Sequence, residues 1–216
     1  MKSLSKSEWG VLSLLFVYSF IPSFGGLIRF LELVGGPAIA PENIRALSNP
    51  LPISVHVLAS FVFCIIGTLQ FLPSIRRKHR ALHRVLGRCV VVAGCLSAAT
   101  GLWMTHFYTF PQSLQGNLLY SVRIVLGSLM FGLIIWAVFA IRSRNFFQHS
   151  AAMVRAYAIG QGASTQTILG ITWIISIGSE ATGPMREFLM VGAWVINLVV
   201  AEIVISKLLT RKSKSA

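Results

Sequence analysis

The sequence predicts an all-α integral membrane protein, a bundle of six transmembrane helices with both termini in the cytoplasm. Of its 216 residues, 55% are hydrophobic and only 12% are charged, about half the charged share of a soluble protein. The apolar residues form continuous runs of roughly 20, long enough to cross the hydrocarbon core, and do not alternate as barrel strands would. Six short-looped crossings nearly exhaust the chain, so we expect one transmembrane domain over residues 1–216.

The predicted spans follow one another without a linker. The first, 11–30, comes after Lys2 and Lys6 and so looks like a signal peptide. Its apolar stretch is long for one, and it lacks a clear small-x-small cleavage site, so we predict a retained helix. The longest loop, 34–52, is rich in glycine and proline and is predicted to form a turn-rich outer cap. The remaining spans are 53–72, 89–108, 118–141, 153–177 and 188–206.

The distribution of charge predicts the orientation. The chain has 19 lysines and arginines against 6 acidic residues, a formal charge of +13. Basic residues in short loops stay on the cytoplasmic side, so we interpret the excess as a topology signal and predict a lipid bilayer, not nucleic acid, as the partner. With the N-terminus inside, only Arg45 and Arg186 fall in outer loops. The inner side holds Lys2, Lys6, Arg76, Arg77, Lys78, Arg80, Arg84, Arg88, Arg142, Arg144, Lys207, Arg211, Lys212 and Lys214.

The motifs of soluble enzymes and of metal centres are missing from the sequence. The three cysteines, Cys64, Cys89 and Cys95, show no CxxC spacing and are interpreted as packing residues. His79 and His83 have the i,i+4 spacing of a metal pair, but the surrounding cations would repel a divalent ion, so no metal site is predicted. There is also no P-loop and no hydrolase nucleophile elbow.

Polar residues within the spans are candidate functional residues, because they are costly in hydrocarbon and face the protein interior. Gln70 lies near the inner end of the second span. In the fifth span Arg155 and Gln166 share one helical face, while Tyr157 lies on a neighbouring face. Arg155 and Glu202 of the sixth span lie at similar depth. Two interpretations stay open: an ion pair between these spans, or an arginine side chain that extends to the headgroups.

Four of the five histidines lie near span ends, His56 and His106 outside and His83 and His149 inside. Two pairs at two depths predict two bis-histidine b-type haems, because neutral imidazole is the usual axial ligand and inner arginines can pair with the propionates. One feature opposes this: His83 and His106 are about 34 Å apart along a straight helix, at the edges of the hydrocarbon. The alternative is that these histidines cap helix ends or bind headgroups and carbonyls.

Several short motifs recur across the central spans: Gly67-Thr-Leu-Gln-Phe71, His83-Arg84-Val-Leu-Gly87-Arg88, Gly101-Leu102, and His149 followed by Met153-Val-Arg155-Ala-Tyr157-Ala158. Over residues 53–175 the chain thereby resembles the predicted membrane proteins grouped as domain of unknown function 2306. The resemblance implies a small polytopic membrane protein with these histidines and arginines as its recurring polar features, and it implies no reaction. The sequence departs from the pattern at Ser150, Ala152 and Gln166, where Arg, Trp and Arg are expected.

These observations predict one candidate site at the inner leaflet. A cationic, donor-rich pocket at the end of an apolar bundle suits an amphipathic ligand with an anionic or carbonyl head, such as haem, a quinone or an isoprenoid precursor. The predicted cofactor-binding residues are His83, His149, His56, His106, Arg84, Arg88, Gln70 and Gln166.

Three functions are consistent with such a site. The first is a haem- or quinone-linked redox protein. The second is a membrane enzyme acting on a lipophilic, isoprenoid-like intermediate, with the catalytic candidates His149, Arg155, Tyr157 and Glu202. The third is a small-molecule carrier, for which Pro22 and the glycines of the spans would provide pliable helices. No paired mid-membrane interruption of the kind typical of carriers is evident in the sequence, so this function ranks last.

Overall fold

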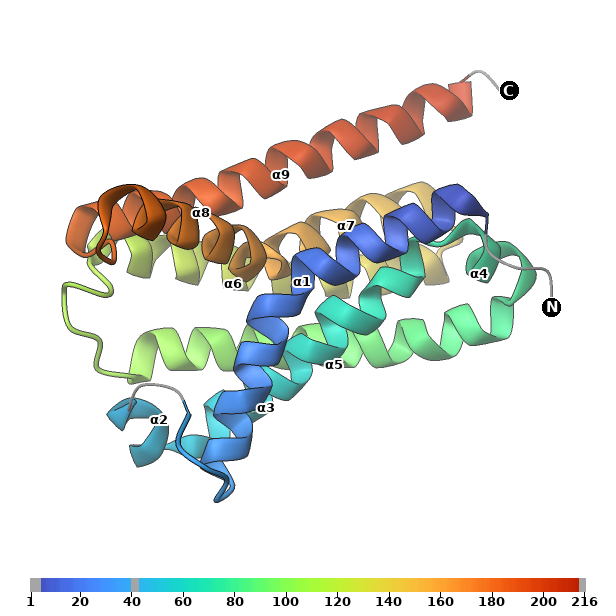
Figure 1. The fold of residues 1–216 in the computed structure, drawn as a ribbon. Coiled ribbons are helices and arrows are strands. Elements are labelled where there is room, and N and C mark those ends of the chain that lie inside the picture. The colour runs from blue at the N-terminus through green and yellow to red at the C-terminus, as the bar shows by residue number, and fades with distance from the viewer. Residues whose placement is uncertain (1–4, 40–42, 214–216) are drawn as a thin grey trace. The chain divides into compact units, whose positions relative to one another are not determined.

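The computed structural model describes residues 5–39 and 43–213, with side chains as far as residue 207. Within these residues every regular element is a helix, which confirms the all-α prediction. The chain packs as two compact units of three predicted spans each (Figure 1). The first unit ends at Tyr108 and the second begins at Thr109, and each is described by itself below. A single transmembrane domain over the whole chain stays a prediction.

Five helical segments are long and apolar enough to cross a membrane. They correspond to the first, second, third, fourth and sixth predicted spans, and each begins or ends a few residues beyond its predicted boundary. The segments are α1 (Lys6–Leu33), Pro50–Phe71, α5 (Arg80–Phe107), α6 (Asn117–Arg142) and Gly183–Lys207, the described part of α9 (Gly183–Ser213).

The fifth predicted span, 153–177, is divided, so the prediction of one continuous helix is wrong. The chain forms α7 (Phe146–Gly160) and α8 (Gly162–Ile177) with a break at Gln161, and neither helix alone is long enough to span a membrane. Trp194 of α9 lies against Gly162 so closely that a Cβ there would be 2.0 Å from the indole nitrogen. The bulky ring and the bare glycine backbone fit together at the break, which a search for apolar length does not detect.

Side chains of α9 satisfy the helix end at this break. The last carbonyls of a helix lack intrahelical partners, and in a membrane no water replaces them. Asn197 Nδ2 donates to the carbonyl of Ala158 at 3.1 Å, and Trp194 Nε1 donates to that of Ile159 at 3.1 Å. The break is therefore built into the packing of α7 and α8 against α9.

The second span is also irregular. Its first part is α3 (Pro50–Phe61), which continues as a π-helix, η1 (Val62–Ile66), and ends as a 3₁₀-helix, η2 (Thr68–Phe71). Such π segments inside α-helices are rare and occur frequently at functional sites. The middle span of each unit is thus irregular, through a π segment in the first unit and a break in the second. The π segment leaves Pro50–Phe71 one continuous span, whereas the break divides the other.

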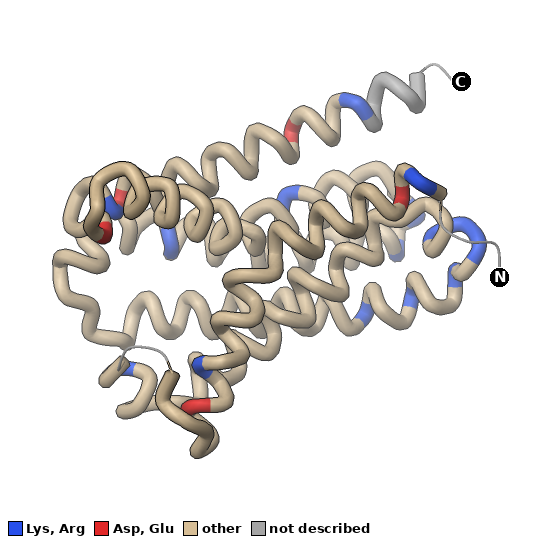
Figure 2. The backbone as a smooth tube through the Cα atoms, viewed as in Figure 1, with Lys and Arg blue, Asp and Glu red and all other residues tan. Residues whose placement is uncertain are grey.

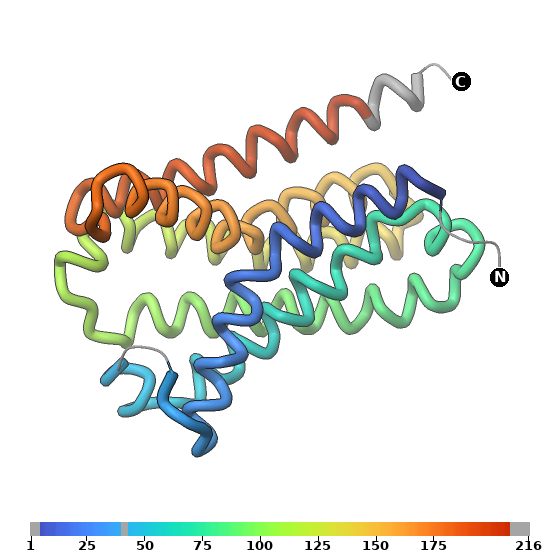
Figure 3. The backbone as a smooth tube through the Cα atoms, in the orientation of Figure 1, coloured from blue at the N-terminus to red at the C-terminus, as the bar shows by residue number. Residues whose placement is uncertain are grey.

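In the first unit, α1 packs against α3, and α3 packs against α5 (Figure 3). A capping box begins α1: Ser5 Oγ accepts from the Glu8 amide at 3.2 Å, and Glu8 accepts from the Ser5 amide at 3.0 Å. The same carboxylate accepts from the Ser74 amide at 2.5 Å and its hydroxyl at 2.6 Å. Ser74 lies in α4 (Pro73–Lys78), so Glu8 joins the start of α1 to the short helix between two spans.

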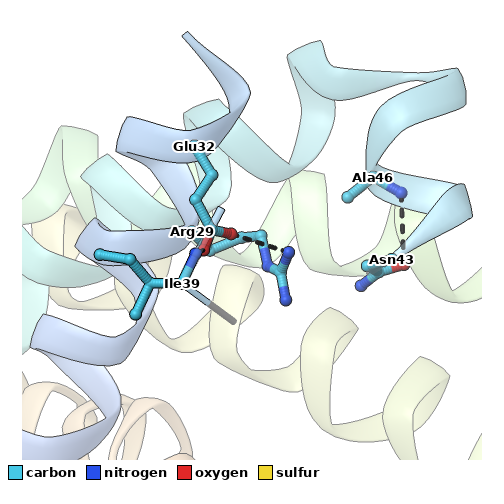
Figure 4. A network of polar contacts seen from close by, with 5 residues as sticks. All are labelled: Arg29, Glu32, Ile39, Asn43 and Ala46. Carbon is cyan, nitrogen blue, oxygen red and sulfur yellow. Dashed lines mark hydrogen bonds and ion pairs between the residues drawn. The ribbon is translucent and has the colours of Figure 1, made fainter. Parts of the chain in front are cut away.

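The loop predicted as a turn-rich cap contains one short helix, α2 (Ile44–Ser48), and the first residues of α3. Figure 4 shows the polar contacts that order it. Glu32 at the end of α1 pairs with Arg29 at 2.8 Å and accepts from the Ile39 amide at 2.7 Å. Asn43 caps α2 by accepting from the Ala46 amide at 3.3 Å. Ile39 is thereby held at the end of α1, and Asn43 at the start of α2.

In the second unit, the start of α9 holds the start of α6. Glu187 accepts from the Leu119 amide at 3.0 Å, one of the amides that the first turn of α6 leaves unpaired. Gly116 leaves room for that carboxylate, because a Cβ there would lie 2.8 Å from its Oε1. The Gly183 amide donates to the Ser113 carbonyl at 2.8 Å, which fastens the same two segments together.

We expect Gly162→Ala to lower the free energy of unfolding by about 1–3 kcal/mol, because the methyl group forces Trp194 away from the Ile159 carbonyl. Thermal unfolding of the purified protein in detergent measures the effect. Gly170→Ala in the same helix is the matched control, since nothing lies within 4 Å of a Cβ there. A Tm equally reduced in both variants would contradict close packing at the break.

Candidate functional site

The basic end of the first unit holds the predicted residues Gln70, His83, Arg84 and Arg88. Gln70 lies over Gly87 of α5, where a Cβ would be 3.3 Å from its Oε1. Its Nε2 is buried and forms no hydrogen bond with any described residue. His83 is half-buried and lies four residues before Gly87, on the same face of α5. The glycine of the HRxxGR motif therefore permits the close approach of Gln70.

The arginines of that motif are exposed. Arg84 and Arg88 form no ion pair with any described residue. A cation without an internal partner keeps its full capacity for an anionic ligand or headgroup. Both arginines are accessible and do not lie in an enclosed pocket, and their role in binding stays a prediction.

The predicted outer haem pair is not brought together. His56 Nδ1 lies 2.9 Å from the Ser97 carbonyl, and its ring packs against Gly101. His106 follows Gly101 by five residues, so it projects from α5 about 140° away around the helix. It is exposed, and its ring lies edge-on to Phe107 with the centroids 4.8 Å apart. These two imidazoles therefore do not face a common iron position.

In the second unit, His149 joins α7 to α6. It is half-buried, and its Nδ1 lies 3.0 Å from the Ala137 carbonyl. A carbonyl oxygen only accepts, so Nδ1 carries the proton and the lone pair of the neutral ring is on Nε2. No described residue forms a hydrogen bond with Nε2. His83 belongs to the first unit, so its predicted pairing with His149 stays a prediction.

Arg155 and Glu202 form the ion pair that was one of the two interpretations of the sequence. Arg155 Nε lies 2.5 Å from one carboxylate oxygen and Nη2 lies 2.8 Å from the other, a bidentate geometry between α7 and α9. The arginine therefore does not extend alone to the headgroups. Because each charge is engaged by the other, this pair is better suited to joining helices than to catalysis.

A buried polar cluster, which we define as Tyr157, Gln161, Ser164, Thr165 and Asn197, surrounds the break between α7 and α8. Gln161 donates to the Tyr157 hydroxyl at 2.8 Å and accepts from Ser164 at 2.7 Å. Thr165 donates to Asn197 at 2.6 Å. All five residues are at most 8% exposed. Of the predicted catalytic residues, only Tyr157 belongs to this cluster.

Sequence reasoning missed Asn197, Trp194 and Thr165 as members of the site. Ala193, Asn197 and Ala201 are four residues apart and buried, so they lie on one face of α9. This spacing is the sequence signal that would have predicted an inward-facing Asn197. Gln166 lies on the other side of the break from Arg155 and donates to the Met190 carbonyl at 3.1 Å. The Gln166 side chain is therefore bonded to α9, and it does not form one polar helical face with Arg155.

The comparisons agree with this description. The family model described as "Predicted membrane protein (DUF2306)" matches residues 53–205. The chain belongs to this family. The match runs from the start of the second span through most of α9. It therefore covers the π segment, the break at Gln161 and every predicted site residue. It extends the resemblance seen in the motifs by including Asn197 and Glu202. A search of curated proteins and a search of solved structures each found no match.

Family membership and the apolar helices together show a multi-pass integral membrane protein. Two family motifs acquire a structural meaning here. The glycine of His83-Arg84-Val-Leu-Gly87-Arg88 accommodates Gln70, which itself belongs to the motif Gly67-Thr-Leu-Gln-Phe71. Ala152, where the family pattern predicts Trp, is only 2% exposed. A Trp in its place would therefore require a different packing around α7.

A double-mutant cycle on Arg155→Ala and Glu202→Ala should give a coupling energy of about 0.5–1 kcal/mol in detergent, because a bidentate pair forms between side chains that are both partly exposed. Unfolding free energies of the two single variants and the double variant measure it. The matched cycle combines Arg155→Ala with Glu187→Ala and should show no coupling. Equal coupling in both cycles would contradict a specific pair.

Proposed function

We propose that the protein is a membrane redox protein in which His149 is an axial ligand of a b-type haem. The observation that carries this proposal is the hydrogen bond between His149 Nδ1 and the Ala137 carbonyl. Histidines that ligate a metal through Nε2 commonly donate Nδ1–H to a carbonyl or carboxylate, which fixes the tautomer and the ring orientation. His149 is held in that state on a rigid helix pair.

The surroundings of His149 suit the rest of the cofactor. Haem is amphipathic, with an apolar macrocycle and two propionates. Arg142 and Arg144 lie in the turn that precedes His149, are exposed, and form no ion pair with any described residue. The neighbouring positions Ala151 and Ala152 are small and buried. Cations for the propionates and small side chains beside an apolar ring are thus close in sequence to the ligand.

His56 supports the same chemistry in the first unit. Its Nδ1 donates to the Ser97 carbonyl, so it has the same tautomer as His149. Gly101 allows the ring to approach α5 closely. Two of the five histidines, one in each unit, therefore share one anchoring geometry.

The test is the absorption spectrum of the purified full chain, produced with added haem precursor. We expect a Soret band and a reduced spectrum typical of b-type haem, and we expect His149→Ala to lose most of it because an axial ligand is removed. His79→Ala is the control, since His79 is exposed at the start of α5. A chain without haem absorption, or a His149→Ala variant with an unchanged spectrum, contradicts the proposal.

A carrier is the second candidate function, favoured by the irregular middle span of each unit, which has a π segment in the first unit and a break in the second. Carriers often bind substrate where spanning helices are broken. In the second unit the break lies beside Ser164, which is 2% exposed and belongs to the buried polar cluster. A membrane enzyme is supported less well, because Arg155, Glu202 and Tyr157 are engaged with one another or with the cluster.

If the break opens alternately to both sides, Ser164→Cys in a background without the three native cysteines should react with impermeant maleimide from either face of sealed vesicles, because alternating access exposes one position in turn. Mass spectrometry of the labelled protein measures the reaction. Val125→Cys, on the exposed side of α6, is the control, because it measures how far a cysteine on the outer surface of a span reacts without any opening of the break. Labelling of Ser164→Cys from one face only, or from neither, contradicts the carrier.

A further inference from the structure

A hollow at the basic end of the first unit is not used by the proposed haem site. It lies where α1, η2 and α4 meet and has a volume of about 420 Å³. Its charged residues on α4 are Arg77 and Lys78, both exposed. Val11 and Phe71 supply apolar lining. The hollow therefore presents two cations beside an apolar surface.

Short helix α4 is held firmly enough to define this hollow. Ile75 and Leu72 are buried, and Glu8 accepts from both the amide and the hydroxyl of Ser74. The buried face and the polar anchor leave the basic side chains of α4 on the outside. Arg77 and Lys78 thus extend from an anchored helix.

The electrostatic balance favours an anion. Among the described residues that line the hollow, Glu8 is the acidic one, and its carboxylate accepts hydrogen bonds from Ser5 and Ser74. Six cations, Arg76, Arg77, Lys78, Arg80, Arg84 and Arg88, lie on α4 and the first part of α5. Figure 2 shows the basic positions of the chain in blue. None of these six cations forms an ion pair with a described residue. One engaged carboxylate does not compensate this charge.

We propose that the hollow binds an anionic phospholipid. Arg77 and Lys78 contact the lipid phosphate, and an acyl chain follows Val11 and Phe71 into the apolar region. Basic clusters next to a transmembrane helix attract anionic headgroups. The apolar lining distinguishes a lipid from a free phosphate ion, which would gain nothing from it. The predicted topology places this end in the cytoplasmic leaflet.

This site goes beyond the role of basic residues in orienting the chain. An orientation signal depends only on the number of cations on one side of the membrane. A lipid site depends on where they are, because Arg77 and Lys78 are the cations that line the hollow among the residues that the structure describes. Removing the same charge elsewhere on the basic side therefore separates the two effects.

The experiment titrates phosphatidylglycerol into the detergent-solubilised full chain and measures bound lipid by native mass spectrometry. Arg77→Gln/Lys78→Gln should weaken binding by about thirtyfold, since each cation near a headgroup contributes on the order of a fivefold effect. The control, Arg80→Gln/Lys207→Gln, removes two exposed cations that do not line the hollow and should bind within about twofold of the unmodified chain. Phosphatidylcholine and inorganic phosphate are titrated in parallel and should not compete.

Equal loss in both double variants would overturn the proposal, because it would show a general attraction between charges. Competition by inorganic phosphate would also overturn it, since the apolar lining would then contribute nothing. A thermal unfolding scan of each variant accompanies the titration. Both pairs of substituted side chains are exposed, so an unchanged Tm without lipid is expected and ties the loss of binding to the hollow.

Discussion

The absence of water from the membrane interior is the constraint on which this structure depends. Every backbone carbonyl and amide there must find a partner within the protein, and a continuous helix is the simplest solution. The break at Gln161 departs from that solution, so the nearby carbonyls of Ala158 and Ile159 need donors. Asn197 and Trp194 of α9 provide them. The donors of Asn197 and Trp194 in α9 thus compensate an irregularity in another helix.

The same constraint explains how polar side chains are distributed in the second unit. Arg155 and Glu202 neutralise each other, and Gln161 is enclosed between Tyr157 and Ser164. A polar residue within the bilayer is costly whether or not it has a function, so its presence alone does not identify a site. What distinguishes a binding residue is capacity left over after its structural contacts are counted. His149 keeps Nε2 after its Nδ1 is engaged, whereas the guanidinium of Arg155 is already bidentate.

Fold class and the positions of five spans could be predicted because apolar length is an additive property of the chain. The Arg155–Glu202 pair was predictable for a related reason: two opposite charges at equal depth have few alternatives. The break at Gln161 was not predictable from hydropathy, since 153–177 is apolar on both sides of it. Its cause is the contact between Gly162 and Trp194, residues of different helices. Likewise, His56 of α3 packs against a face of α5 from which His106 does not project, and this depends on the register between two helices, which periodicity within one helix does not specify.

Counting leftover capacity divides the predicted site residues into two groups. Gln166, Tyr157, Arg155 and Glu202 are used by the fold, because each is bound to another helix or to the cluster at the break. His149, Gln70, Arg84 and Arg88 retain a donor, a lone pair or a charge that no described residue takes. An enzyme that moves protons through the first group would have to dismantle its own helix contacts during turnover. A cofactor or lipid bound by the second group leaves those contacts intact, and this difference is why binding accounts for the arrangement better than acid–base catalysis.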